Sequence, residues 1–243
     1  MIMKKLEKKI ILITGANSGI GRATAVLAAK EGANVIVNYL KNEKEAEKVV
    51  KELQDIGSDA VAIEADVSNY DEVLKMSLIV KEKYGKINGI VNNASASLDY
   101  KRFVDSDWND FKKHIEVQIH GAFNVVKAFL PLFANGEAGS IVNIASRVTL
   151  GSSAAGISGY ATAKYGLIGL TNALANELEK RRIRVNAVSP SFVETGLTKN
   201  LPRIYKEISA NGSLGIKPGD VAEEVINLLS SDAADLNGIN LPV

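Results

Sequence analysis

The chain has 243 residues, 46% of them hydrophobic, which suits one large α/β domain or two small ones with a substantial core. Its 29 basic and 28 acidic residues give a net charge of +1, so no overall field favours nucleic acid or an anionic membrane. The sequence contains no cysteine, which excludes a disulfide framework, a thiolate zinc site and a cysteine nucleophile. Residues 1–9 are charged and lack the apolar stretch of a signal peptide, and no apolar run reaches the ~20 residues that span a bilayer. We therefore expect a cytoplasmic protein without a membrane partner.

Short β-branched runs alternate with longer helical patterns along the chain. The predicted strands are residues 10–14, 35–39, 60–65, 89–92, 140–145 and 184–189, and the predicted helices are residues 19–31, 43–56, 70–84, 107–133, 159–180 and 219–230. The strands are apolar enough to be covered on both faces. Repeated strand–helix–strand units of this kind predict an α/β fold with a doubly wound parallel sheet and helices on both faces. No linker interrupts the alternation, so we expect a single domain over residues 1–243.

Two irregular segments follow predicted strands. Residues 93–106 come after the fourth strand, and residues 190–217, with two of the five prolines, come after the sixth. Both are expected beyond the carboxyl ends of strands, where open α/β sheets bind ligands. Because long irregular connections often close over a site, we expect residues 190–217 to form a substrate loop.

A glycine-rich turn, T-G-A-N-S-G-I-G at residues 14–21, separates the first predicted strand from the first predicted helix. Glycine permits a tight turn there and lets backbone N–H groups approach an anion closely. The following helix points its positive end at the same place, which suits a pyrophosphate. The spacing is not G-x-G-x-x-G, and the lysine of a P-loop is absent. Its position after a first strand makes a dinucleotide site a better interpretation than a simple turn.

The end of the second predicted strand bears on the choice of cofactor. An acidic residue at this place commonly holds the adenosine ribose of NAD. The chain has the neutral Asn38 instead, which removes repulsion against a 2′-phosphate, and Lys41 or Lys44 offers a cation. The pattern favours NADP, and NAD stays open as the alternative.

Tyr160 and Lys164 lie one turn apart near the start of a predicted helix and therefore share a face. A nearby ammonium favours the tyrosinate, which suits a tyrosine for acid/base catalysis. An ordinary tyrosine and lysine on a helix would give the same pattern. Ser146 favours the catalytic interpretation, because it follows a strand whose carboxyl end is expected to face the same ligand.

Together these residues resemble the short-chain dehydrogenase/reductase family, whose motifs they match in order from about residue 8 to residue 243. The resemblance includes Asp66-Val67, Asn92-Asn93-Ala94 and the segment from Arg184 to Pro190. It implies a Rossmann fold in which Tyr160 transfers the proton, Lys164 also holds the nicotinamide ribose and Ser146 orients the substrate oxygen. The cofactor contacts that it implies are Gly15, Asn17, Ser18, Gly19, Ile20, Gly21, Asn38, Asp66, Val67, Asn93, Ala94, Tyr160, Lys164, Pro190 and Val193. The chain looks most like 3-oxoacyl-acyl-carrier-protein reductases and sugar or polyol dehydrogenases.

The sequence departs from the family pattern at several positions. Gln118 stands where the family has its fourth catalytic residue, an asparagine, and the added methylene is expected to displace the water relay behind Lys164. Ser95 and Ser191 replace family glycines. The chain stops at residues 240–243, where the family continues through D-G-G to a short tail.

The leading hypothesis is an NADP-dependent oxidoreductase that interconverts a ketone and a secondary alcohol. For a substrate bound to an acyl carrier, Lys101, Arg102 and Arg147 are candidates for a basic rim. A sugar or polyol dehydrogenase and a non-catalytic dinucleotide-binding sensor are the alternatives. The family resemblance also implies a homo-tetramer or dimer that pairs through residues 107–133. His114 and His120 are six residues apart and do not share a helix face, so we expect no metal site and assign neither a role.

Overall fold

The computed structural model describes residues 4–151, 153, 155–193, 195–198 and 215–243. Its strands are β1 (Ile10–Ile13), β2 (Asn34–Tyr39), β3 (Val61–Glu64), β4 (Gly89–Asn92), β5 (Gly139–Ile144), β6 (Ile183–Ser189) and β7 (Asn240–Pro242). Its α-helices are α1 (Gly19–Lys30), α2 (Glu43–Asp55), α3 (Tyr70–Tyr84), α4 (Trp108–Ile115), α5 (Gly121–Phe129), α6 (Ser158–Leu178) and α8 (Pro218–Leu229). Among the described residues, no helix is long and apolar enough to cross a membrane.

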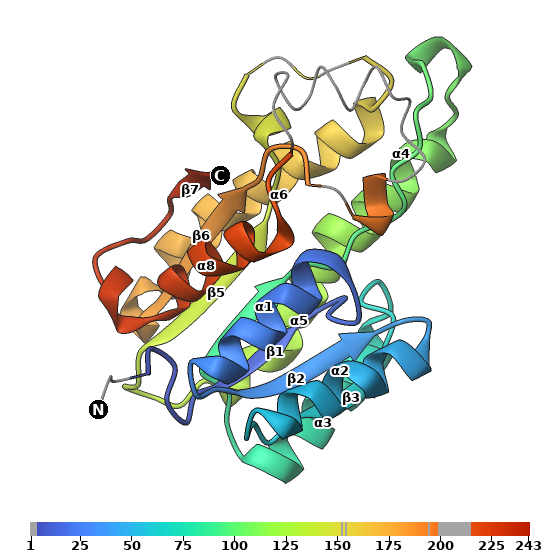
Figure 1. The fold of residues 1–243 in the computed structure, drawn as a ribbon. Coiled ribbons are helices and arrows are strands. Elements are labelled where there is room, and N and C mark those ends of the chain that lie inside the picture. The colour runs from blue at the N-terminus through green and yellow to red at the C-terminus, as the bar shows by residue number, and fades with distance from the viewer. Residues whose placement is uncertain (1–3, 152, 154, 194, 199–214) are drawn as a thin grey trace.

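The strands form one parallel sheet in the order β3-β2-β1-β4-β5-β6-β7 (Figure 1). The chain begins at β1, moves outward to β3, and then returns to place β4 on the other side of β1. The connections after β1 and β4 therefore leave in opposite directions, which opens a crevice between the carboxyl ends of these strands. The prediction of a doubly wound parallel sheet is confirmed.

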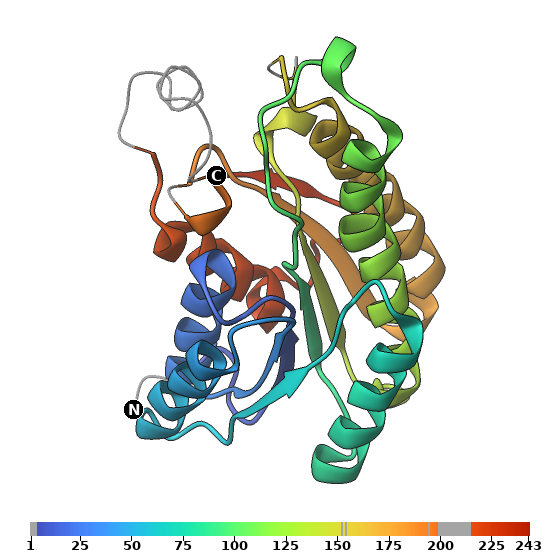
Figure 2. The same ribbon diagram turned by 90° about the vertical axis from the view of Figure 1, so that its right-hand side faces the viewer.

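Helices cover both faces of the sheet, as Figure 2 shows with the sheet seen between two helical layers. The layer of α1, α2 and α8 packs on Ile11, Ile13, Val35 and Val37, and the opposite layer packs on the alternate strand residues, which include Leu12. Because successive strand residues point to opposite faces and both faces are buried, the strands read as continuous apolar runs. This double burial is why the sequence pattern predicts the six longer strands to within two residues.

Two elements differ from the predictions. Strand β7 is not predicted, because three residues that include a proline carry no strand pattern, and only its pairing with β6 defines it. The helix predicted over residues 107–133 is divided into α4, a five-residue π-helical turn called η2 (Glu116–His120), α5 and a 3₁₀ turn (Leu130–Leu132). A π turn adds one residue to an otherwise continuous helix, so hydrophobic periodicity does not reveal it.

Candidate active site

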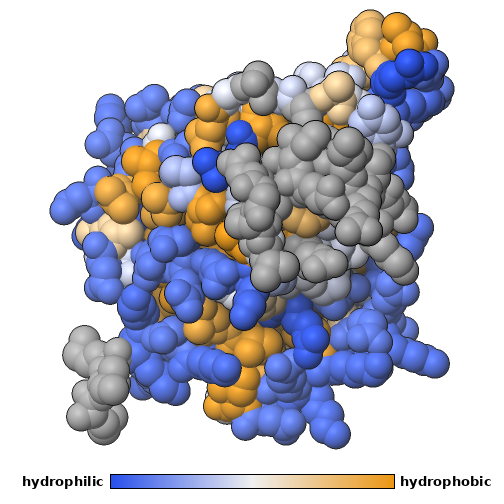
Figure 3. All heavy atoms as spheres, turned by 45° about the horizontal axis from the view of Figure 1, so that its top comes forward, coloured by the Kyte–Doolittle hydropathy of each residue, from blue (hydrophilic) through white to orange (hydrophobic). Residues whose placement is uncertain are grey.

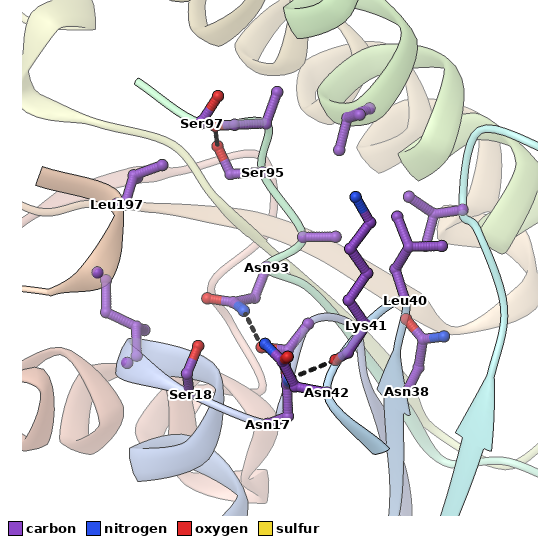
Figure 4. A pocket seen from close by; sticks show the side chains of 18 of the residues that line it. Asn17, Ser18, Asn38, Leu40, Lys41, Asn42, Asn93, Ser95, Ser97 and Leu197 are labelled. Carbon is purple, nitrogen blue, oxygen red and sulfur yellow. Dashed lines mark hydrogen bonds between the residues drawn. The ribbon is translucent and has the colours of Figure 1, made fainter. Parts of the chain in front are cut away.

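A cavity of ≈ 610 Å³ lies at the carboxyl ends of β1 to β4, where the order of the strands reverses (Figure 4). Many of the predicted cofactor residues line it, namely Gly15, Asn17, Ser18, Gly19, Ile20, Asn38, Asp66, Val67, Asn93 and Ala94. They come from four separate connections of the chain, which the sheet brings to one edge. The position matches the crevice in which open α/β sheets bind nucleotides.

The glycine-rich turn is braced by the loop that follows β4. The Thr14 hydroxyl accepts hydrogen bonds from the backbone N–H groups of Asn93 (2.9 Å) and Ala94 (3.0 Å). The Asn93 amide donates in return to the Thr14 carbonyl at 2.8 Å. On the other side, Asn17 donates to the carbonyl of Lys41 at 2.9 Å. These bonds hold the walls of the cavity in place before any ligand binds.

Gly21 lies behind this turn and is not among the residues that line the described cavity. A Cβ atom added at Gly21 would stand 2.5 Å from the Asn93 amide nitrogen and 2.5 Å from the Gly15 carbonyl oxygen. The family resemblance implies a cofactor contact here. The structure places Gly21 where α1 packs closely against the turn, and the cofactor contact at this glycine stays a prediction.

The beginning of α1 presents backbone donors to the cavity. Its N-cap residue, Ser18, makes no side-chain capping hydrogen bond within the described part of the chain. The first N–H groups of a helix need acceptors and carry the positive end of the helix dipole. These donors, a braced turn with no room for a Cβ atom and a cavity of this size fit the pyrophosphate of a dinucleotide.

Asn38 and Lys41 form the side of the cavity after β2. The buried Asn38 amide donates to the Ala65 carbonyl at 3.0 Å, which fixes this neutral side chain between the ends of β2 and β3. Lys41 lines the cavity, and Figure 4 shows its side chain extending into it, whereas Lys44 is not among the lining residues. Asp66 is held by Ser68, whose hydroxyl donates to its carboxylate at 2.7 Å. Of the two lysines that the sequence offers as a cation for a 2′-phosphate, Lys41 is therefore the one that lines the cavity.

Tyr160 and Lys164 are both buried on α6, with 8% and 3% of their surfaces exposed. The Lys164 ammonium donates to the Ile144 carbonyl at 2.6 Å and lies 5.6 Å from the centre of the Tyr160 ring. Burial lowers the pKa of Lys164 to about 7. Ser146 is half-buried two residues beyond Ile144, and its Oγ accepts a long hydrogen bond from the Val148 N–H at 3.4 Å. The helix thus brings Lys164 to the same end of β5 that carries Ser146.

The buried lysine predicts a pH dependence of stability in the cofactor-free protein. The unfolded chain keeps this proton up to the ordinary pKa of 10.5, while the folded chain releases it near pH 7, so the free energy of unfolding rises with pH between these values. Over two pH units above 7 the gain is about 2 kcal/mol. Urea unfolding of the wild type and of Lys164→Met at several pH values measures it. An equal rise in both proteins would contradict the assignment to Lys164.

The segment after β6 contains the remaining predicted contacts. Pro190 is buried, and its carbonyl accepts a hydrogen bond from the Arg147 N–H at 2.9 Å, which joins the ends of β5 and β6. Val193 is buried and bridges to Ile216. Residues 194 and 199–214, which make up most of the predicted substrate loop, lie outside the described residues.

His114 is a site residue that the sequence reasoning misses. It is buried on α4, with its Nδ1 atom 3.1 Å from the Gln118 amide nitrogen and its ring edge-on to Tyr160 at 5.7 Å between centroids. His120 is exposed and stacks on Phe123. The signal for His114 is its spacing of four residues from Gln118, which puts both on one helix face. Within the described part of the chain, no cluster of His, Asp or Glu could hold a metal ion.

The basic rim expected for an acyl carrier is weaker than its sequence implies. Lys101 is paired with Asp110 at 2.6 Å, and Arg102 with Asp105 at 3.0 Å. The corner around residues 100–105 projects from the molecule at the upper right of Figure 1, and at the upper right of Figure 3 apolar and hydrophilic side chains lie side by side. Since both cations already have acidic partners, only Arg147 of the three candidates has no ion pair among the described residues.

Comparison with known proteins gives consistent matches over nearly the whole chain. A 3-oxoacyl-[acyl-carrier-protein] reductase from Thermotoga maritima is 37% identical over 240 residues, which cover 96% of this chain and 95% of that protein. A reductase of the same name from Staphylococcus aureus is 38% identical over 202 residues, 82% of this chain and 80% of its own.

Solved structures share the fold closely. A short chain dehydrogenase from Burkholderia cenocepacia in complex with NADP has a TM-score of 0.91 at 29% identity, covering 98% of this chain and 97% of that one. Carveol dehydrogenase from Mycobacterium avium in complex with NAD also has a TM-score of 0.91, at 25% identity, with 99% and 97% covered. Residues 9–205 match the short chain dehydrogenase family. The chain therefore belongs to the short-chain dehydrogenase family and is a nicotinamide-dependent oxidoreductase.

Proposed function

We propose that this protein is an NADPH-dependent reductase of 3-oxoacyl groups carried on an acyl carrier, with the 3-hydroxyacyl group as its product. The observation that carries the proposal is the buried pair of Tyr160 and Lys164 on α6, where the Lys164 ammonium is bonded to the carbonyl of Ile144, the last residue of β5. Relatives named 3-oxoacyl-[acyl-carrier-protein] reductase, 37–38% identical, support the substrate class.

The reaction needs a hydride at the carbonyl carbon and a proton at the carbonyl oxygen. NADPH, when bound, supplies the hydride. The Tyr160 hydroxyl donates the proton to the oxygen as the carbonyl π bond breaks, and the Ser146 hydroxyl donates a hydrogen bond to the same oxygen. Lys164, in its charged form, stabilises the tyrosinate that remains, and its bond to the Ile144 carbonyl holds the ammonium in place.

The preference for NADPH over NADH follows from the side of the cavity after β2. Asn38 places no negative charge there, and Lys41 lines the cavity. A charge-assisted bond from lysine to the 2′-phosphate would contribute about 1.5–3 kcal/mol, or roughly a 10- to 100-fold preference.

Lys41→Glu is expected to lower kcat/KM with NADPH by roughly 10- to 100-fold, because it replaces attraction for the 2′-phosphate by repulsion. Activity with NADH should change much less, since NADH lacks that phosphate. Lys44→Glu is the matched control: it makes the same charge change three residues away, outside the lining of the cavity. Equal effects of the two variants, or equal effects on both cofactors, would contradict the role given to Lys41.

The proposal is tested by following NADPH consumption with a 3-oxoacyl group on an acyl carrier protein, with simple ketones and with sugar substrates. Turnover fastest with the acyl-carrier substrate is the expected result. Faster turnover of a sugar or polyol would contradict the proposed substrate class but not the interconversion of a ketone and an alcohol. Tight NADPH binding without turnover of any carbonyl compound would support the sensor alternative and contradict the proposal.

The cytoplasmic location and the homo-tetramer or dimer stay predictions. Equilibrium sedimentation of the purified protein tests the second. A monomer at all concentrations would contradict it.

A further inference from the structure

We propose that His114 is a positioning residue: by holding the Gln118 amide nitrogen, it turns the Gln118 carbonyl oxygen toward a small cavity shared with Asn92, where the two oxygens bind one water molecule. The inference rests on the proposed reaction only in its kinetic part, because the pairing itself is a property of the folded chain. It concerns the position at which Gln118 replaces the family's asparagine.

The close packing of α4 on α6 brings His114 to Gln118 and Tyr160. A Cβ atom added at Gly159 would stand 2.8 Å from the Asp110 carbonyl oxygen and 3.1 Å from the Phe111 Cα, so only glycine allows this approach. His114 follows on the next turn of α4 and Tyr160 is the neighbour of Gly159, and their rings meet edge-on. One imidazole therefore contacts both the amide of Gln118 and the ring of the predicted acid.

The contact between His114 and Gln118 determines which atom donates the hydrogen bond and which accepts it. An amide nitrogen can only donate, so His114 Nδ1 accepts the bond from Gln118 and the imidazole hydrogen is on Nε2. Burial, with Lys113 and Lys164 nearby, lowers the pKa of His114 to about 4, and Asp99 and Asp110 oppose this only in part. The ring is therefore a neutral acceptor at neutral pH.

Gln118 is left with an unsatisfied oxygen. Gln118 is only 2% exposed, and its buried Oε1 atom has no hydrogen-bond partner among the described residues. Gln118 lines a small cavity that His114 does not line. Because the nitrogen is turned to His114, the oxygen is the atom available to the cavity.

Asn92 supplies a second unsatisfied oxygen to the same cavity, and its orientation is fixed by a chain of donors. The Thr171 hydroxyl donates to the Leu167 carbonyl, so it accepts from Asn143 at 2.8 Å. Asn143 then accepts from the Asn92 amide nitrogen at 2.8 Å, which leaves Asn92 Oδ1 buried without a described partner. A buried acceptor without a donor costs about 1–3 kcal/mol, so two of them in one cavity call for a donor.

A water molecule fits this cavity in size and in chemistry. The room for the centre of a water-sized sphere is ≈ 10 Å³, close to the ~10–15 Å³ that one buried water needs. Water has two hydrogens to donate, one to each oxygen. The bond to His114 thus holds the longer side chain of Gln118 in an orientation that lets its oxygen bind this water molecule.

The first test reads the pairing without any turnover. The chain has two histidines, so the variant His120→Gln leaves His114 as the single imidazole in long-range proton–nitrogen NMR spectra. We expect the Nε2–H tautomer with no protonation between pH 7 and 5, and a changed Nδ1 signal when Gln118→Leu is added. An Nδ1–H tautomer, an ordinary titration near 6.5, or an Nδ1 signal indifferent to Gln118→Leu would overturn the proposal.

The second test is a double-mutant cycle in kcat with NADPH. His114→Leu is expected to lower kcat about 10-fold with little change in KM for NADPH, and about threefold or less when Gln118 is already leucine. His114→Asn, whose side-chain oxygen can accept in place of Nδ1, is expected to restore most of kcat. Equal losses in both Gln118 backgrounds would contradict an action through Gln118. Thermal unfolding of each variant identifies any that fail to fold, and the NMR comparison then decides.

A crystal structure that resolves ordered water is expected to show one molecule bonded to both Asn92 Oδ1 and Gln118 Oε1. A dry cavity would refute the water site. If the wild type turns over no carbonyl compound, the proposed function fails, while the NMR and crystallographic results still decide the pairing.

Discussion

Tyr160→Phe is expected to lower kcat for reduction of a 3-oxoacyl thioester by about 10²–10⁴-fold, the usual contribution of a general acid. The substitution removes only the hydroxyl, so the edge-on contact with His114 and the position of Lys164 over the ring are kept. NADPH affinity should therefore change little, and thermal unfolding of the variant measures any change in stability. Initial-rate assays of NADPH consumption measure kcat, and fluorescence titration measures NADPH affinity. Together they distinguish a loss of proton transfer from a loss of cofactor binding.

Tyr165→Phe is the matched control for this prediction. Tyr165 lies on the same helix, is half exposed, and its hydroxyl donates to the Gly151 carbonyl at 2.9 Å rather than to the predicted site. Its loss should leave kcat close to that of the wild type. Unaltered turnover in Tyr160→Phe would show that another group donates the proton.

Gly21→Ala is expected to raise the Kd for NADPH by more than about 10-fold and to lower the free energy of unfolding by about 1–3 kcal/mol. The added methyl group would overlap the Gly15 carbonyl and the Asn93 amide, so the turn and its brace must move apart. Both groups belong to residues that line the predicted dinucleotide cavity. Binding titrations with NADPH and urea unfolding of the cofactor-free protein measure the two effects.

Gly169→Ala is the matched control, because it makes the same substitution at a glycine that does not pack against the glycine-rich turn. Gly169 is an exposed glycine inside α6, and a Cβ atom added there would meet no described atom within 4 Å outside its own neighbourhood. Alanine should stabilise this helix by up to about 1 kcal/mol and leave cofactor binding unchanged. If Gly21→Ala binds NADPH as tightly as Gly169→Ala does, the close packing behind the turn is not required.

Much of the fold is predictable because its elements are buried on both sides. Runs such as the one around Val35 and Val37 are continuously apolar, and this pattern marks strands between two helical layers. The parallel order then brings the residues after β1 to β4 to one edge, which is why the predicted contacts from Gly15 to Ala94, apart from Gly21, line one cavity. Strand β7 escapes prediction because its pairing with β6, not its own composition, makes it a strand.

The parts of the site that depend on packing between helices are not predictable in the same way. The spacing of His114 and Gln118 shows that they share a helix face, but only contact with α6 makes that face an inner one next to Tyr160. The π turn that contains Gln118 leaves the hydrophobic pattern almost unchanged.

The ion pairs on the surface also include one that the sequence predicts and one that only the fold creates. Arg102 and Asp105 are three residues apart on one turn, a spacing that favours an ion pair. Lys101 and Asp110 are nine residues apart and meet only because the loop folds back onto α4. Because both cations are paired, counting Lys101 and Arg102 as a basic rim overstates the attraction for an acidic partner.

The most direct test of the central claim is the initial rate of NADPH oxidation with a 3-oxoacyl group on an acyl carrier protein, compared between the wild type and Tyr160→Phe. The proposed reductase requires steady turnover in the wild type, formation of the 3-hydroxyacyl product in equal amount, and a loss of about 10²–10⁴-fold in the variant. A wild type that binds NADPH but forms no hydroxyacyl product, or equal rates in the two proteins, would contradict it.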